Sequence, residues 1–241
     1  MMVVVLLDLD GTIMLSGGAG KRAMEGVFSQ KFGVPDGFSG IIPDGKTDPE
    51  IFREMIEKWG VKVDDREEVV LEELKNRYIE LLRCEVPKSE NAYLMPGVRG
   101  LILEIKKRSN IMLGLLTGNY EQGAKIKLSK FNLADCFEFG AFGSDSETRP
   151  ELVKIAIERA EKAYGKKISM GKNIVIIGDT PRDVACAIMF GLTSIAVATG
   201  RYSADDLKRA GADYVFTDLA DTNKVLSVIE GCDEEVGSAT R

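Results

Sequence analysis

The amino-acid sequence predicts an α/β fold, with a Rossmann-like parallel sheet core, helices on both faces of the sheet and an inserted all-helical cap domain. The apolar run VVVLL at residues 3–7 suits a parallel strand that is buried on both faces. From Pro96 onward, helical and strand patterns alternate, which is typical of a parallel sheet. Residues 15–95 show helical patterns and no convincing strand. We therefore expect the core at 1–14 and 96–241 and the cap at 15–95.

The cap segment contains predicted helices at residues 21–33, 48–59 and 64–85. The second of these begins with Asp48, a favourable N-cap residue, and Pro49 follows it at the first helical position. The third is rich in Glu, Leu and Lys, which favour helices.

The core segment alternates between helices and strands up to a short final stretch. Helices are expected at 97–109, 119–131, 150–164, 181–190, 203–210 and 221–230, and strands at 111–117, 137–142, 173–178, 194–198 and 213–216. Residues 232–241, CDEEVGSATR, are expected to form a loose tail.

Composition excludes several classes of function. The net charge of −6 argues against general binding to nucleic acid or to an anionic membrane. The chain has no histidine, which excludes His-dependent triads, His-ligated zinc sites and phosphohistidine chemistry. Its four cysteines are widely spaced and form no CxxC pair, as in a reduced cytoplasm. The N-terminal apolar run is too short for a signal peptide or a membrane span. We expect a cytoplasmic protein, either a monomer or a homodimer.

Polar side chains follow three of the predicted strands. Asp8 and Asp10 come after the first strand, Thr117 ends IMLGLLT, and Asp179 follows NIVIIG. Ligands of open α/β sheets bind beyond the carboxyl ends of the strands, so these side chains should meet at one edge. Two close carboxylates repel each other unless a cation or a proton intervenes, and a cluster of oxygen ligands favours Mg²⁺. One carboxylate can then act as a nucleophile and the other as a general acid and base.

The neighbouring residues could bind a phosphoryl group. The hydroxyl of Thr117 can donate to a phosphate oxygen, and Gly118 and Asn119 can offer backbone N–H groups where the next helix begins. Arg149 precedes Pro150 at another helix start and could pair with phosphate or with Asp8.

The segment GDTPRDV supplies a further pair of carboxylates. Asp179 and Asp183 are four residues apart, so both can face one site if the helix has begun. They are candidate metal ligands together with Asp8 and Asp10.

The motifs LLDLDGT, LLTGN, a basic residue before proline and GDTPRDV together resemble the haloacid dehalogenase-like superfamily over nearly the whole chain. The resemblance implies that Asp8 is the nucleophile, that Asp10 is the general acid and base, and that Thr117 binds the phosphoryl group. It also implies a Mg²⁺ ion held by the Asp8 carboxylate, the Asp10 backbone carbonyl and Asp179. Asp183 would bind the ion or support its ligands.

Within the superfamily the chain resembles the phosphoglycolate phosphatase and β-phosphoglucomutase branch. The segment GKTDPEIF at 45–52 is similar to a cap segment that carries substrate-facing residues, and MPGV at 95–98 resembles the return from cap to core. The candidates for substrate binding there are Gly45, Lys46, Thr47 and Asp48, of which Lys46 is best suited to an anionic substrate.

The third motif departs from the family pattern, because Arg149 stands where the family usually has lysine. A planar guanidinium is not equivalent to a compact ammonium, so Lys154 or Lys172 could take that role instead.

The expected function is a Mg²⁺-dependent phosphatase that hydrolyses small phosphorylated metabolites, similar to 2-phosphoglycolate or a sugar phosphate, through an aspartyl phosphate. The dehalogenases of the superfamily lack the aspartate at the position of Asp10, which favours phosphoryl transfer. Three alternatives remain open at this stage: a sugar phosphomutase, a phosphonate hydrolase that would need a cap lysine to form an imine, and a non-catalytic metabolite-binding protein on the same scaffold.

Overall fold

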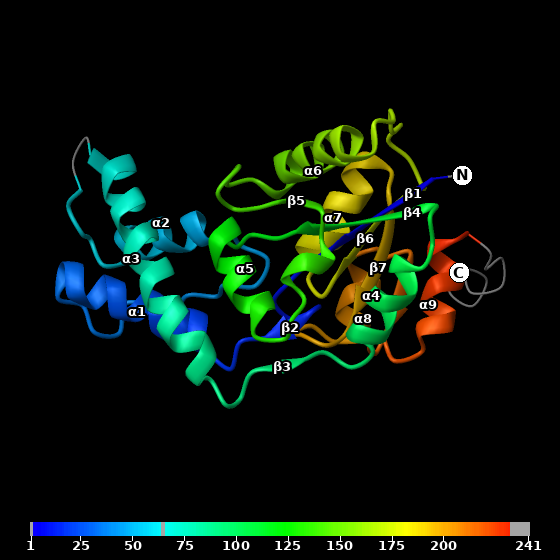
Figure 1. Cartoon of the computed structure of the whole chain (residues 1–241). Coiled ribbons are helices and arrows are strands. Elements are labelled where there is room, and N and C mark those ends of the chain that lie inside the picture. Colours follow the sequence, from blue (N-terminus) through cyan, green and yellow to red (C-terminus); the bar gives the residue numbers. More distant parts are fainter. Residues whose placement is uncertain (1, 64–65, 232–241) are drawn as a thin grey trace.

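A six-stranded parallel sheet forms the centre of the molecule, in the strand order β5-β4-β1-β6-β7-β8 (Figure 1). The computed structural model describes residues 2–63 and 66–231, so the expected tail at 232–241 lies outside the described residues. The strands are β1 (Val3–Leu7), β4 (Ile111–Leu116), β5 (Phe139–Ala141), β6 (Ile174–Gly178), β7 (Thr193–Val197) and β8 (Tyr214–Phe216). The predicted α/β class and parallel sheet are confirmed.

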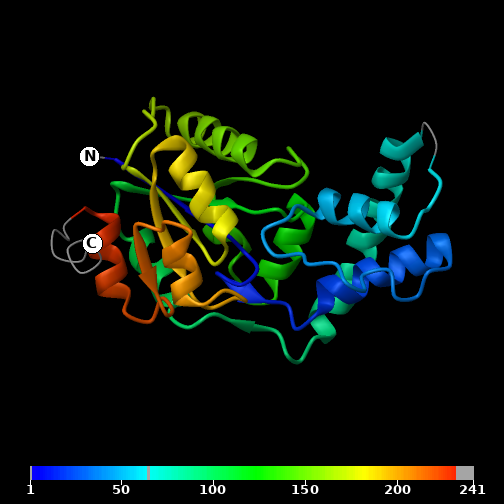
Figure 2. The ribbon, with the colours of Figure 1, turned by 180° about the vertical axis from the view of Figure 1, so that it is seen from behind.

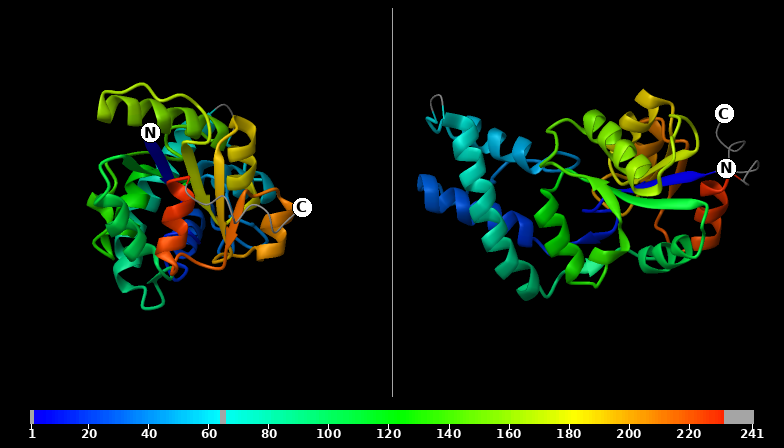
Figure 3. Two further views of the ribbon diagram at one scale, coloured as in Figure 1. Left: turned by 90° about the vertical axis from the view of Figure 1, so that its right-hand side faces the viewer. Right: turned by 45° about the horizontal axis from the view of Figure 1, so that its top comes forward.

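Helices cover both faces of this sheet (Figure 3). One face packs against α4 (Val98–Lys106), α5 (Glu121–Ser129) and α9 (Thr222–Ile229), and the other against α6 (Arg149–Tyr164), α7 (Pro181–Phe190) and α8 (Ala204–Arg209). Side chains of β1 alternate between the two cores, since Val5 and Leu7 pack on the first face and Val4 and Leu6 on the second. A strand buried on both faces needs the continuous apolar run seen in the sequence.

Three further helices form a separate lobe beside the sheet (Figure 2). They are α1 (Ala19–Phe32), α2 (Asp48–Lys58) and α3 (Glu67–Lys88). Phe28, Phe52 and Tyr78 are fully buried in the apolar cluster of this lobe, and Tyr120 joins the cluster from the loop before α5. The proposed boundaries of the cap at 15 and 95 remain a prediction.

Two local predictions are wrong. Residues 15–95 do contain a strand, because β3 (Tyr93–Leu94) pairs antiparallel with β2 (Met14–Leu15) where the chain leaves and re-enters the core. The N-cap of α2 is Thr47 and not Asp48, since the Thr47 hydroxyl accepts the Glu50 N–H and the Glu50 side chain returns to the Thr47 N–H. The other predicted helices and strands are found with ends shifted by a few residues.

Among the residues that the structure describes, no helix combines the length and the apolarity needed to cross a bilayer.

Candidate active site

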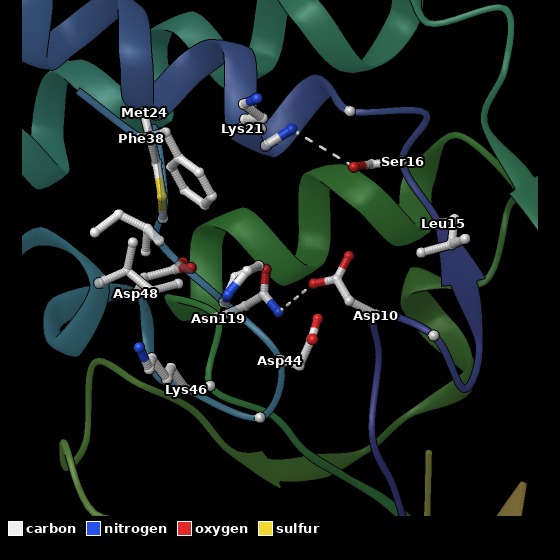
Figure 4. Close-up of a pocket in the computed structure, with 18 of the residues that line it drawn as sticks. Asp10, Leu15, Ser16, Lys21, Met24, Phe38, Asp44, Lys46, Asp48 and Asn119 are labelled. Atoms are coloured by element: carbon white, nitrogen blue, oxygen red, sulfur yellow. Dashed lines mark hydrogen bonds between the residues drawn. The ribbon is translucent and has the colours of Figure 1, made fainter. Parts of the chain in front are cut away.

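A cavity of about 860 Å³ lies between the helical lobe and the carboxyl end of the sheet. Asp8 directly follows β1, Thr117 follows β4 and Asp179 follows β6, and these strands are neighbours in the sheet. Their side chains therefore reach one end of the cavity. Figure 4 shows the opposite wall, where Met24 and Phe38 of the helical lobe form an apolar end.

Three carboxylates form a buried cluster at the sheet end of the cavity. Asp8, Asp179 and Asp183 each offer an oxygen within 4.8 Å of the others. Asp183 reaches the cluster because α7 begins at Pro181, and its other oxygen completes a capping box with Thr180. Burial raises the pKa of Asp8 to about 7 and that of Asp179 to about 8, and the neighbouring carboxylates add to both shifts.

Glycines make room for Asp179. A Cβ on Gly11 would fall 2.3 Å from Asp179 Oδ2, and one on Gly200 would fall 1.8 Å from the same oxygen. Gly11 also has φ of +87°, which turns the chain sharply after Asp10. The Thr12 hydroxyl donates to Asp179 Oδ1 at 3.1 Å and so fixes the carboxylate.

Arg149 bridges the acidic cluster from the start of α6. Its Nη2 donates to Asp8 Oδ1 at 3.1 Å and to Asp183 Oδ1 at 2.5 Å, while Nη1 lies 3.4 Å from the carbonyl oxygen of Gly45 in the cap segment. The guanidinium therefore reaches Asp8. Lys154 pairs with Glu151 and Lys172 with Asp213 on the exposed surface, so the suggestion that either lysine replaces Arg149 is wrong.

A divalent cation could compensate the excess negative charge of this cluster. Three carboxyl groups face a single guanidinium, so their full ionisation would leave a buried excess of negative charge, which is costly unless a cation compensates it. The donors are all carboxylate oxygens, which suit Mg²⁺ better than softer metals. The residues present thus fit the ion that the motifs suggest.

The carboxylate of Asp10 lies apart from this cluster and has different partners. Its Oδ2 accepts from Asn119 Nδ2 at 2.8 Å and from Lys127 Nζ at 2.6 Å (Figure 4 shows the Asn119 bond). Thr117 is buried, and its Oγ1 accepts from Asn119 Nδ2 at 2.9 Å. Lys127 is a site residue that the sequence reasoning missed, because it lies in a lysine-rich helix typical of a solvated surface.

The cap segment brings its candidates to the cavity in different ways. Lys46 lines the cavity and pairs with Glu54, and Gly45 lines it beside Arg149. Thr47 does not line it, since its hydroxyl caps α2 and lies 3.4 Å from the carbonyl oxygen of Glu147. The structure therefore brings the predicted residues together except for Thr47.

Asp48 docks the cap segment on the loop after β4. Its backbone N–H donates to the Gly118 carbonyl at 2.8 Å, and its carboxylate accepts the Tyr120 N–H at 2.8 Å. Burial raises the pKa of Asp48 to about 7, although Lys127 and the Tyr120 N–H oppose the shift. Asp48 thus joins the wall of the cavity to the phosphoryl-binding loop expected at 117–119.

Comparisons with known proteins agree with this architecture. A family model for haloacid dehalogenase-like hydrolases matches residues 2–191. The glyceraldehyde 3-phosphate phosphatase of Pyrococcus furiosus is 26% identical over 251 residues, covering 98% of each chain. A solved structure of a predicted phosphatase from Clostridium acetobutylicum superposes with a TM-score of 0.70 at 21% identity, over 94% of this chain and 100% of that one. A solved structure of a predicted phosphoglycolate phosphatase from Haemophilus somnus superposes with a TM-score of 0.68 at 16% identity, over 93% of this chain and 98% of that one. Since the family model spans most of the sequence, this chain is an enzyme that belongs to the haloacid dehalogenase-like hydrolase family.

Proposed function

We propose that this enzyme is a Mg²⁺-dependent phosphatase that hydrolyses small phosphorylated metabolites through an aspartyl phosphate. The observation that carries the proposal is the buried cluster of three carboxylates around Arg149, which opens into the cavity beside Thr117 and Asp10. Phosphoryl transfer needs positioning and charge compensation, and this cluster can supply both.

Each residue has a distinct role in this proposal. The Asp8 carboxylate attacks phosphorus, and Arg149 holds that carboxylate in place through its 3.1 Å hydrogen bond. Asp10 protonates the leaving oxygen and then takes a proton from the water that hydrolyses the aspartyl phosphate. Thr117 donates its hydroxyl to the phosphoryl group. When bound, Mg²⁺ held by Asp8, Asp179, Asp183 and the Asp10 backbone carbonyl would offset the negative charge of that group.

The substrate class follows from the cavity and the relatives. The wall of the cavity formed by the helical lobe carries Lys46 and Lys21, which can pair with an anionic or polar substrate, beside the apolar Met24 and Phe38. A relative is named a glyceraldehyde 3-phosphate phosphatase and a structural neighbour a predicted phosphoglycolate phosphatase. We therefore propose short-chain phosphomonoesters, with 2-phosphoglycolate, glyceraldehyde 3-phosphate and sugar phosphates as the compounds to test first.

The test is phosphate release from these compounds and from p-nitrophenyl phosphate in the presence of Mg²⁺. We expect Asp8→Asn to lower kcat by about 10³-fold or more, since the amide cannot attack phosphorus, and to leave the far-UV circular dichroism spectrum unchanged. Asp205→Asn, an exposed aspartate of α8, is the matched control and should retain the wild-type rate. Full activity of Asp8→Asn would refute the proposal. Conversion of a sugar phosphate without release of phosphate would instead identify a mutase.

A further inference from the structure

Lys127 is a buried cation to which the roles above assign no task. Its side chain is 5% exposed, and its Nζ donates to Asp10 Oδ2 and to Asn119 Oδ1, both at 2.6 Å. Lysine is almost never this buried unless it is paired. The fold therefore accepts a desolvated ammonium in order to place it beside Asp10.

The ammonium also determines how Asn119 is oriented. An ammonium can only donate, so Asn119 must turn its Oδ1 toward Lys127. The amide nitrogen then points the other way and donates to Asp10 Oδ2 at 2.8 Å and to Thr117 Oγ1 at 2.9 Å. Lys127 thus acts on Asp10 twice, once directly and once through Asn119.

The two oxygens of Asp10 become unequal as a result. Oδ2 accepts two N–H donors, whereas none of the residues that the structure describes donates to Oδ1. A proton on the carboxyl group must therefore sit on Oδ1, because Oδ2 already faces two hydrogens. Asp10 lines the cavity and its side chain is 37% exposed, so this proton is available to a bound substrate (Figure 4).

The helical lobe closes over the same point. A Cβ on Gly20 of α1 would lie 3.7 Å from Lys127 Nζ and 3.7 Å from the Tyr78 hydroxyl of α3. Asp48 also interacts electrostatically with the ammonium. The Lys127–Asp10 pair lies at the seam between lobe and sheet, with Lys127 buried and Asp10 open to the cavity.

We propose that Lys127 is a positioning residue, which holds Asp10 by one oxygen so that the other delivers the proton to the leaving group. This inference rests on the proposed phosphatase function. In the first step an Asp8 oxygen forms a bond to phosphorus, the bond from phosphorus to the leaving oxygen breaks, and the Asp10 Oδ1 proton moves to that oxygen. In the second step Asp10 Oδ1 accepts a proton from water as the water oxygen bonds to phosphorus and the Asp8–phosphorus bond breaks. Lys127 compensates the Asp10 anion between the two steps.

The test compares substrates whose leaving groups differ in basicity. Alkyl phosphates need a proton on the departing alkoxide, whereas p-nitrophenolate leaves readily without one. For Lys127→Met we expect kcat/KM, which reports the step that forms the aspartyl phosphate, to fall about 100-fold or more on the alkyl phosphate that the wild type hydrolyses fastest. On p-nitrophenyl phosphate we expect kcat/KM to fall less than about fivefold. An equal loss on both substrates would show a structural role, and a rise in KM without a loss in kcat would show substrate binding. Either result overturns the inference.

A double mutant provides the second readout. If Lys127 acts through Asp10, adding Lys127→Met to Asp10→Asn should lower kcat on the alkyl phosphate by less than about twofold further, and independent losses would overturn the inference. This variant also keeps the test valid if Lys127→Met alone does not fold, because it removes both charges of the pair.

The matched control is Lys125→Met on the same helix. Lys125 is exposed and pairs with Glu121 at 2.7 Å, so both substrates should be hydrolysed at the wild-type rate. If the wild type releases phosphate from neither substrate, the proposed function fails and the role of Lys127 fails with it. If the wild type is active and the leaving groups make no difference in Lys127→Met, the role of Lys127 alone is refuted.

Discussion

Asp48 shows how one buried carboxyl can link protonation to stability. Its pKa rises from 3.8 to about 7, chiefly because burial disfavours the anion. Below about pH 4 the group is protonated in the folded and unfolded chains alike. Between about pH 4 and pH 7 Asp48 keeps a proton in the folded chain that it has lost in the unfolded chain. The contribution of Asp48 to the free energy of unfolding therefore declines as the pH rises. Above about pH 7 the full cost of the buried anion is present.

We therefore expect Asp48→Asn to stabilise the protein at pH 8 and to leave it unchanged near pH 4. The amide oxygen can still accept the Tyr120 N–H, while the buried charge is removed. A gain of roughly 1 kcal/mol would raise Tm by about 2–4 °C, measured by thermal unfolding in metal-free buffer. The same gain at both pH values would contradict this assignment, because it would show that the charge of Asp48 is not its cause.

The sequence could predict some of these residues and not others. Asp8, Thr117 and Asp179 follow apolar strands, and a parallel sheet brings such ends together whatever the loops do. The sequence pattern indicates only weakly that Lys127 belongs to the site. Lys127 falls on the buried stripe of α5 with Gly123 and Ala124, but a polar helix with further lysines reads equally well as a solvated surface.

At the scale of elements, the start of α2 determines how the lobe meets the sheet. The segment at 45–48 passes so close to the loop after β4 that a Cβ on Gly118 would lie 2.1 Å from the Lys46 carbonyl oxygen. Both groups belong to the backbone, so neither can move aside as a flexible side chain would. The absence of a side chain at position 118 therefore lets the segment at 45–48 reach the loop after β4, for which we propose phosphoryl binding.

Gly118→Ala should separate these two segments and lower kcat/KM for phosphate release by more than about tenfold, because small displacements in an active site are costly. Gly100→Ala is the matched control: its Cβ would meet Thr222 Oγ1 at 3.4 Å, and alanine is favoured over glycine in a helix by about 1 kcal/mol. The control should keep the wild-type kcat/KM and melt no lower. Wild-type kinetics in Gly118→Ala would mean that the close approach has no part in catalysis.

Elements also differ in how far sequence patterns predict them. The buried strand β1 and the long helix α3 carry strong patterns, and both were predicted. The two-residue strands β2 and β3 are too short to show a period of two, and they form because the entry and exit of the lobe lie side by side. The sequence pattern places the N-cap of α2 one residue late, at Asp48 instead of Thr47, since threonine and aspartate are both favourable N-cap residues.

At the scale of the whole molecule, the charge of the acidic cluster would couple the proposed binding of Mg²⁺ to folding. Asp8 and Asp179 must lose their protons before they can bind a cation, and their raised pKa values of about 7 and 8 place this loss within the neutral range. A cation that binds the folded chain alone stabilises it by about 2.7 kcal/mol at 100 times its Kd. For a protein of this size that free energy corresponds to a rise in Tm of about 5–10 °C.

We expect Mg²⁺ to raise Tm by this amount at pH 8.5 and by less at pH 6, in thermal scans matched for ionic strength with KCl. Asp179→Asn removes one of the three clustered carboxylates and should abolish most of the rise, whereas Asp205→Asn should keep it in full. A rise of equal size in all three proteins would place the ion elsewhere on this acidic chain. A rise that is larger at pH 6 than at pH 8.5 would contradict binding to ionised Asp8 and Asp179, because protons would then be helping the metal to bind instead of competing with it.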